Sequence, residues 1–274
     1  MFKIIIMALL IFIGMVGYDS ITDKAQPTTP VQQEQQKVSK HEKSAAMALF
    51  TSLLPPKEEW PSPVHKFYLA FNMDEVIDPI RQNPNWTSLD AMSRDIPHAL
   101  IAIEDHAFYN HGAIAVEGIL RAALANINAG EVVQGGSTLT QQFVKNVFLS
   151  HEQSMERKIE EAVLSLMLED NYSKDEILEL YLNTTYFGAG STGIKQASRT
   201  YFGKAPSALT LAEAAVIASL PYAPTGLNPL ENPEGCKKRQ LLVLAAMHKY
   251  GMINQGQLAE AKAEKIRLTN GTVM

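Results

Sequence analysis

Two adjacent carboxylates, Glu104 and Asp105, follow an apolar segment and precede Phe108 and His111. Carboxylate and imidazole side chains are common general bases and charged ligands in enzymes. If the segment were helical, Glu104, Phe108 and His111 would share one face, because they are four and then three residues apart. An exposed helix end with a solvated acidic pair explains the same residues. This segment alone leaves both interpretations open.

A second polar segment starts at two glycines and continues with hydroxyl, amide and cationic side chains. It runs Gly135-Gly136-Ser137-Thr138-Leu139-Thr140-Gln141-Gln142-Phe143-Val144-Lys145-Asn146. A glycine turn that leads into a helix N-terminus is a natural anion site. On such a helix Thr138, Gln142 and Lys145 would form one polar face ending in a cation. A capped surface helix would begin in the same way, but this run of neutral polar groups ending in one lysine favours binding.

A third group consists of Arg157, Lys158 and Glu161. In a helix the carboxylate of Glu161 would neighbour both cations. An ordinary surface ion pair of this kind contributes about 0.3–0.5 kcal/mol. The same residues could instead hold a carboxylate and two cations beside a phosphate or a developing charge. Spacing does not separate these two interpretations.

The rest of the chain must supply elements that position these groups, and its apolar periodicity predicts helices almost throughout. Helical spacing of apolar residues recurs over 114–127, 155–168, 174–182 and 210–220. Ser173, with Glu176 three residues later, predicts a capping box. One more amphipathic helix is expected over 255–266, and one short strand over 65–71. The sequence therefore predicts a mostly α-helical domain.

The N-terminus has the plan of an export segment. Lys3 precedes an apolar run over 4–17, which as a helix would rise about 20 Å, against about 30 Å for a bilayer core. The absence of a small-x-small cleavage site or a lipoprotein cysteine favours an uncleaved anchor over a cleaved signal. We expect a membrane anchor or signal over 1–18, a flexible tether with a short helix over 19–59, and the folded domain over 60–274.

Composition excludes several classes of protein and site. The net charge of −5 argues against a nucleic-acid binder. Cys236 is the single cysteine, which excludes an internal disulfide and a multi-cysteine metal site. The segment 188–193 fits the glycine spacing of a dinucleotide fingerprint, but no strand is evident before it, so we reject that match.

Taken in order, these segments resemble the peptidoglycan glycosyltransferases of glycosyltransferase family 51. This family comprises the transferase module of class A penicillin-binding proteins and the monofunctional glycosyltransferases. The matching runs are Glu104-Asp105-x-x-Phe108-x-x-His111, Gly135-Gly136-Ser137-Thr138-Leu139-Thr140-Gln141-Gln142-x-x-Lys145-Asn146, Arg157-Lys158-x-x-Glu161, Lys174-Asp175-Glu176-Ile177-Leu178-Glu179-x-Tyr181-Leu182-Asn183, Tyr186-Phe187-Gly188-x-Gly190-x-x-Gly193-Ile194 and Ala218-Ser219-Leu220-Pro221-x-x-Pro224. One departure stands out: Ala113 occupies the place of a usual glycine, and Ala115 that of a frequent aspartate.

The resemblance implies a mostly α-helical, lysozyme-like two-lobed domain with an N-terminal membrane anchor helix. It implies that the protein polymerises lipid II into β-1,4-linked glycan strands, with inversion at the anomeric carbon and undecaprenyl diphosphate as the leaving group. Glu104 would be the catalytic base and Glu161 the second catalytic carboxylate. The residues that would bind substrate and diphosphate are Asp105, Phe108, His111, Ser137, Thr138, Gln142, Lys145, Asn146, Arg157 and Lys158.

The resemblance also implies a cellular setting. The partners would be lipid II, the nascent glycan strand, the bilayer, and transpeptidases or other wall-synthesis proteins, with no nucleic acid. The protein would cross the bacterial cytoplasmic (inner) membrane once, with its catalytic domain on the outer, periplasmic face. No cofactor would be required, although Glu161 could hold a divalent cation, Mg²⁺ or Mn²⁺. The apolar helix over 114–127 would either lie on the membrane or pack into the core.

Two alternatives to polymerisation remain open. A lysozyme-like lytic enzyme also uses two carboxylates, but it needs no diphosphate site of the kind that 135–146 predicts. A degenerate module that only binds wall precursor is the second alternative, and Ala113 keeps it open. The motifs of a transpeptidase serine site, Ser-x-x-Lys and Lys-Thr-Gly, do not occur in the sequence.

Overall fold

The computed structural model describes residues 68–130, 135–149 and 154–274, with the side chains of 123–126 and 128–129 left out. The chain divides into two units, Met1–Asn72 and Met73–Met274. The anchor and tether predicted over 1–59 lie outside the described residues. Among the residues that are described, no helix has both the length and the apolar character needed to cross a bilayer.

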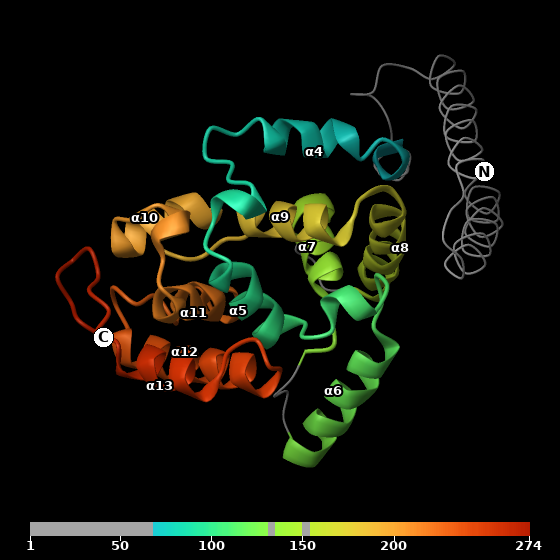
Figure 1. Ribbon diagram of the computed structural model, residues 1–274. Coiled ribbons are helices and arrows are strands. Elements are labelled where there is room, and N and C mark those ends of the chain that lie inside the picture. The colour runs from blue at the N-terminus through green and yellow to red at the C-terminus, as the bar shows by residue number, and fades with distance from the viewer. Residues whose placement is uncertain (1–67, 131–134, 150–153) are drawn as a thin grey trace, which may run out of the picture. The chain divides into compact units, whose positions relative to one another are not determined.

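The unit over Met73–Met274 is built from α-helices, which confirms the prediction of a mostly α-helical domain (Figure 1). They are α4 Asp74–Arg81, α5 Asp95–Glu104, α6 Val116–Ala129, α7 Leu139–Phe148, α8 Met155–Asn171, α9 Lys174–Thr184, α10 Ile194–Phe202, α11 Leu211–Ser219, α12 Pro233–Lys249 and α13 Gln255–Ala263. In the described ranges, β pairing is limited to two isolated bridges, Tyr186 with Thr192 and Arg267 with Val273.

The helix starts follow local capping chemistry. The hydroxyl of Ser173 accepts a hydrogen bond from the backbone amide of Glu176, and the carboxylate of Glu176 accepts one from the backbone amide of Ser173, so the predicted capping box is confirmed. Thr210 forms a second capping box at the start of α11. Caps of this kind are worth about 1 kcal/mol each, because they satisfy amide groups that a helix start leaves without partners.

Two sequence predictions were wrong. Residues 68–71 are helical rather than a strand, and the amide of Asn72 donates to the carbonyl of Tyr68 over 3.1 Å. The last helix, α13, ends at Ala263 rather than at 266. Beyond it the chain turns back on itself, and the amide of Ile266 donates to the carbonyl of Met274 over 3.1 Å. Apolar spacing did not reveal this turn, because Ile266 is still buried.

Two sets of helices hold the elements that carry the predicted site. Helix α11 packs against α5 and α12, and α7 packs against α8 and α9. Every residue from Ala212 to Ser219 in α11 is buried, and four of these are alanines, which allow close approach of the neighbouring helices. The C-terminal end of α5 and the N-terminal end of α7 are therefore fixed by packing on the core.

The glycine-rich segment before α10 forms a tight turn. Gly188 has φ of 86°, and a Cβ placed there would lie 2.3 Å from the carbonyl oxygen of Pro224. No strand precedes this turn among the described residues, since Tyr186 takes part only in an isolated bridge. The glycines serve backbone geometry at this position, in agreement with our rejection of a dinucleotide site.

Candidate active site

Helix α5 ends at Glu104, and Asp105 leaves the helical conformation with φ of −156° and ψ of 69°. A short 3-10 turn, Phe108–Asn110, follows. Glu104 and His111 therefore do not share one helix face, and the helical spacing considered from the sequence does not apply. What brings the segment together is Phe108, which is fully buried beneath the turn.

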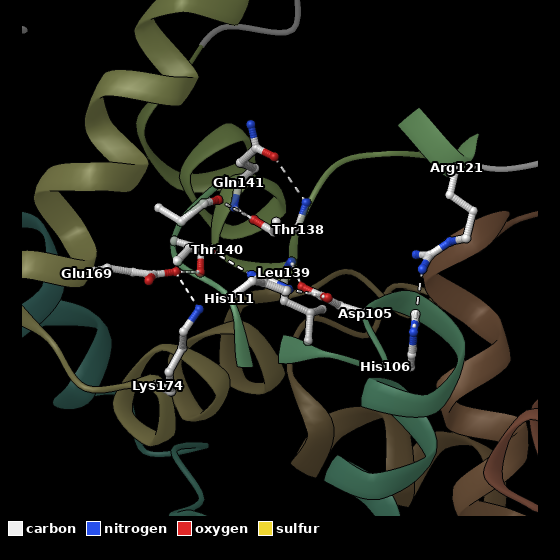
Figure 2. A network of polar contacts seen from close by, with 12 residues as sticks. Asp105, His106, His111, Arg121, Thr138, Leu139, Thr140, Gln141, Glu169 and Lys174 are labelled. Atoms are coloured by element: carbon white, nitrogen blue, oxygen red, sulfur yellow. Dashed lines mark hydrogen bonds and ion pairs between the residues drawn. The ribbon is translucent and has the colours of Figure 1, made fainter. Parts of the chain in front are cut away.

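Asp105 joins this segment to the N-terminus of α7. One of its carboxylate oxygens, Oδ1, lies 2.6 Å from Nε2 of His111. The other, Oδ2, accepts a hydrogen bond from the backbone amide of Leu139 over 3.0 Å. Figure 2 shows the carboxylate of Asp105 between these two partners. A negative group is favoured at a helix N-terminus, because the free amides there carry partial positive charge.

The ring of His111 lies between two hydrogen-bond acceptors. Nε2 faces the carboxylate of Asp105, and Nδ1 lies 2.6 Å from the carbonyl oxygen of Gly112. Both nitrogens can bond only by donating, which describes the protonated imidazolium. The hydrogen bond to Asp105 raises the pKa of His111, burial opposes this, and the bond to Gly112 raises it again. Asp105 and His111 thus form a charged pair that fixes the turn.

Ala113, the residue that departs from the family pattern, is held in place by its surroundings. It is buried, and its carbonyl accepts a hydrogen bond from the hydroxyl of Thr138 over 2.7 Å. Its φ is not positive, because Ala189 is the one non-glycine residue with positive φ in the described ranges. The backbone at 113 therefore does not require glycine, and alanine is accommodated without strain.

Helix α7 begins at a capping box formed by Thr138 and Gln141. The hydroxyl of Thr138 accepts from the amide of Gln141 and donates to Ala113, so both of its roles are used inside the protein. Gly136 lies just before this cap, and a Cβ there would come within 3.0 Å of the α6 backbone at Ile119. The predicted glycine turn thus lets the start of α7 and α6 approach closely.

Gln142 connects Glu104 to a buried tyrosine. Its amide nitrogen donates to Oε2 of Glu104 over 3.0 Å. Its amide oxygen accepts from the hydroxyl of Tyr181, also over 3.0 Å. Burial, and then the negative charge of Glu104, raise the pKa of Tyr181, so its hydroxyl keeps its proton. Sequence reasoning missed Tyr181. The one signal in the sequence was a tyrosine hydroxyl between two leucines of α9.

Glu161 lies in a contrasting setting on α8. Its side chain is 2% exposed and pairs with both predicted cations, Arg157 at 3.2 Å and Lys158. The ammonium group of Lys158 also donates to the hydroxyl of Ser137 over 3.0 Å. Since Ser137 immediately precedes the cap of α7 and Gln142 lies within α7, this one helix connects the surroundings of both glutamates.

The remaining predicted site residues differ in exposure. Lys145 and Asn146 are exposed on α7. Phe108 is buried, and the ammonium of Lys174 lies 4.4 Å from the centre of its ring. Lys174 also pairs with Glu169, which accepts from Thr140 over 2.6 Å (Figure 2). Phe108 therefore supports the turn from below and presents no surface to a substrate.

A polar cluster next to Asp105 was not predicted. The ring of His106 stacks on Tyr250, with centroids 4.2 Å apart, and its Nε2 lies 3.5 Å from a guanidinium nitrogen of Arg121. Burial, and then the positive charge of Arg121, lower the pKa of His106. A neutral ring can accept from Arg121, so the cluster joins the turn to α6 and to the end of α12.

The described residues contain no group of three or more His, Cys, Asp or Glu side chains that could hold a metal ion. The carboxylate oxygens of Glu161 are both engaged by the cations Arg157 and Lys158. These contacts form an ion-pair network centred on Glu161.

Comparison with known proteins gives a consistent result. Residues 73–248 match the family described as Transglycosylase. A Cupriavidus necator protein assigned by name to the transglycosylases is 41% identical over 194 residues, covering 71% of this chain and 84% of that protein. Penicillin-binding protein 1A of Aquifex aeolicus is 44% identical over 176 residues, covering 64% of this chain and 24% of its own length. Penicillin-binding protein 2D of Bacillus subtilis is 45% identical over 181 residues, covering 66% and 26%.

This chain thus spans most of the Cupriavidus protein and about a quarter of the two penicillin-binding proteins. The matched residues 73–248 include both glutamates, the cations around Glu161 and the whole of α7. The resemblance found in the motifs is confirmed: this chain belongs to the transglycosylase family, the peptidoglycan glycosyltransferases of family 51.

Proposed function

We propose that this protein polymerises lipid II into β-1,4-linked glycan strands, with inversion at the anomeric carbon and undecaprenyl diphosphate as the leaving group. One observation carries the proposal. Helix α7 connects a half-buried carboxylate held by a neutral amide, Glu104, to a carboxylate and two cations centred on Glu161. Removal of a proton needs a carboxylate like Glu104. Stabilisation of a departing anion needs cations like those around Glu161.

Glu104 acts as the general base in this proposal. It removes the proton from the 4-hydroxyl of the acceptor sugar while that oxygen attacks the anomeric carbon of the donor. The bond from this carbon to the diphosphate oxygen breaks, and its electron pair leaves with the diphosphate. Attack from the face opposite the leaving group converts the α-linked donor into a β-linked product.

The departing diphosphate gains negative charge, which nearby cations and hydrogen-bond donors stabilise. Lys158 and Ser137 already contact each other at the start of α7, and Arg157 lies on the same helix as Lys158. Lys145 and Asn146 are exposed further along α7. We assign diphosphate binding to these residues and to the second amide hydrogen of Gln142. Thr138 supports them from below, since its hydroxyl is used by Ala113.

Glu161 orients Arg157 and Lys158 in this proposal. A divalent cation at Glu161 is the alternative stated from the sequence, and it would require at least one protein cation to move away from the carboxylate. Activity measured in EDTA and then with added Mg²⁺ or Mn²⁺ separates the two arrangements. Full activity in EDTA supports the ion-pair role, and activity that depends on the added ion supports the metal.

A membrane-bound substrate requires the enzyme to work at the bilayer surface, and α6 suits that location. Its apolar side chains Val116, Ile119, Leu120 and Ile127 are between 44% and 75% exposed. These four side chains are therefore not packed in the core. Core packing was the other arrangement expected for this helix from the sequence. Exposed apolar groups on a helix favour burial at the interface between headgroups and acyl chains.

We further propose the cellular arrangement that this activity requires. Residues 1–18 would anchor the chain in the cytoplasmic membrane, 19–59 would act as a tether, and 60–274 would form the catalytic domain, two-lobed and lysozyme-like, on the outer face. Lipid II, the nascent strand and the bilayer would be its direct partners. Transpeptidases or other wall-synthesis proteins would crosslink the product.

The test is to incubate the purified full chain with labelled lipid II and separate the products by gel electrophoresis. A ladder of glycan strands supports polymerisation. Degradation of purified cell-wall sacculi without any ladder would identify a lytic enzyme instead. Binding of lipid II with neither reaction would identify a precursor-binding module. Glu104→Gln, which keeps the size of the side chain, serves as the inactive control.

A further inference from the structure

We infer that Tyr181 is a positioning residue for the base, acting through the amide of Gln142 on the carboxylate of Glu104. This inference rests on the proposed function, in which Glu104 removes the proton of the acceptor. Tyr181 lies on α9, Gln142 on α7 and Glu104 at the end of α5. The three groups form a chain of two hydrogen bonds, each 3.0 Å long.

The direction of this chain follows from charge. A carboxylate accepts hydrogen bonds and repels the oxygen of an amide, so Gln142 must present its nitrogen to Glu104. Its oxygen then points to Tyr181, whose hydroxyl must donate. The raised pKa of Tyr181, caused first by burial, keeps that hydroxyl protonated. Tyr181 therefore holds, from the opposite side, the one amide orientation that Glu104 requires.

The surroundings make this selection rigid. The side chain of Tyr181 is 1% exposed and lies among buried apolar residues of α9. Helices α7 and α9 pack directly against each other. Without the hydroxyl, the amide oxygen of Gln142 would lose its partner, and the amide would be held by Glu104 alone. The donor that orients the carboxylate would then no longer be fixed in position from the side of α9.

The experiment compares Tyr181→Phe with wild type in lipid II polymerisation, measuring kcat and KM separately. We expect kcat to fall about 10-fold, which corresponds to one hydrogen bond, with KM changed less than about 2-fold. The effect must pass through Gln142. Adding Tyr181→Phe to Gln142→Met should therefore change kcat by less than about 2-fold, because the chain is already broken.

A matched control removes another buried phenol bond. Tyr201 is fully buried, and its hydroxyl donates to the carbonyl of Phe187 over 2.8 Å. Tyr201→Phe should lower thermal stability to a similar extent while kcat stays within about 2-fold of wild type. An equal loss of kcat in Tyr201→Phe would show a general effect of destabilisation and would overturn the inference.

Other outcomes also decide the question. Wild-type kcat in Tyr181→Phe, or an undiminished effect in the Gln142→Met background, overturns the role of Tyr181. If Tyr181→Phe does not fold, Gln142→Met alone tests the same contact from its other end, and wild-type kcat in that variant overturns the inference. Failure of wild-type protein to polymerise lipid II would instead overturn the proposed function, so the two failures are distinguishable.

Discussion

The two glutamates of the site have opposite surroundings. Glu104 is half-buried at the end of α5 and accepts a hydrogen bond from the neutral amide of Gln142. Glu161 is 2% exposed and is held by Arg157 and Lys158. Two cations hold the carboxylate of Glu161 in place through charge-assisted hydrogen bonds. Glu104 thus has a neutral partner, and no ion pair is recorded for it among the described residues.

This difference separates the roles before any substrate is considered. The environment of Glu104 suits proton transfer, which requires the group to change its charge during the reaction. The environment of Glu161 suits a fixed charge that orders its neighbours. Substitutions at the two glutamates should therefore differ in their effects on activity and on stability.

Glu104→Gln should abolish measurable polymerisation, with kcat reduced about 100- to 10,000-fold, because a positioned general base contributes that much. Its stability should hardly change, since the carboxylate lies outside any ion pair in the described contacts and the amide keeps its size. Gel analysis of lipid II products and thermal melting measure the two effects. Substantial polymerisation by a folded Glu104→Gln variant would remove Glu104 from the role of base.

Glu161→Gln should reduce both activity and stability. Removing one partner of a buried ion pair is expensive, because it leaves charge without compensation. Lys158 is 43% exposed and can turn toward solvent, so we expect a loss of about 2 kcal/mol rather than the full penalty of a buried pair. For a domain of this size the Tm should fall by roughly 4–8 °C. An unchanged Tm would mean that the ion pairs contribute nothing to folding.

Asp105→Asn should change how stability depends on pH. The pKa of His111 is raised in the folded protein, chiefly by its bond to Asp105. Its stabilising contribution is therefore fully present below the ordinary histidine value of about 6.5, and it is lost as pH rises through the folded pKa. Tm measured from pH 5.5 to 9 should fall across this window in wild type.

The same series in Asp105→Asn should be flatter, because the variant removes the main cause of the raised pKa of His111. The titration of His106 does not alter the comparison of these Tm curves at higher pH. Its pKa is lowered, so it affects stability only as pH falls below about 6.5. Parallel curves for wild type and variant above this value would show that His111 is not held as the imidazolium.

Arg81→Gln should have the smallest effect and provides a surface reference for Glu161. Arg81 pairs with Glu176 at 2.9 Å, and these side chains are 34% and 44% exposed. Exposed pairs are worth about 0.2–1 kcal/mol, so Tm should fall by no more than about 4 °C and kcat should not change. A loss as large as that in Glu161→Gln would mean that burial does not distinguish the two ion pairs.

Local patterns predicted much of the fold. Helices α6, α8, α9 and α11 were expected from apolar spacing, and the Ser173 cap from residue type, because both depend on neighbours within one or two turns. The sequence left open whether the helix ends at Glu104 or continues, and the structure shows that it ends there. Next to this end, the carboxylate of Asp105 accepts a hydrogen bond from the backbone amide of Leu139, 34 residues along the chain. Contacts of this kind leave no periodic signal.

The candidate site was predicted unevenly for the same reason. The pairing of Glu161 with Arg157 and Lys158 followed from helical spacing, and the structure confirms it. The spacing argument for Glu104, Phe108 and His111 failed, because the helix stops between them. The contact of Gln142 with Tyr181 spans 39 residues and two helices, so no local pattern could have disclosed it.

The two bonds at the base of α6 have a mechanical consequence. Ala113 is fastened to Thr138, and Asp105 to Leu139, so the chain leaves and re-enters the site at nearly the same point. Helix α6 lies between these two points in the sequence, so the chain is clamped on both sides of it. A force that acts on the exposed side chains of α6 would meet these two bonds before it reached Glu104.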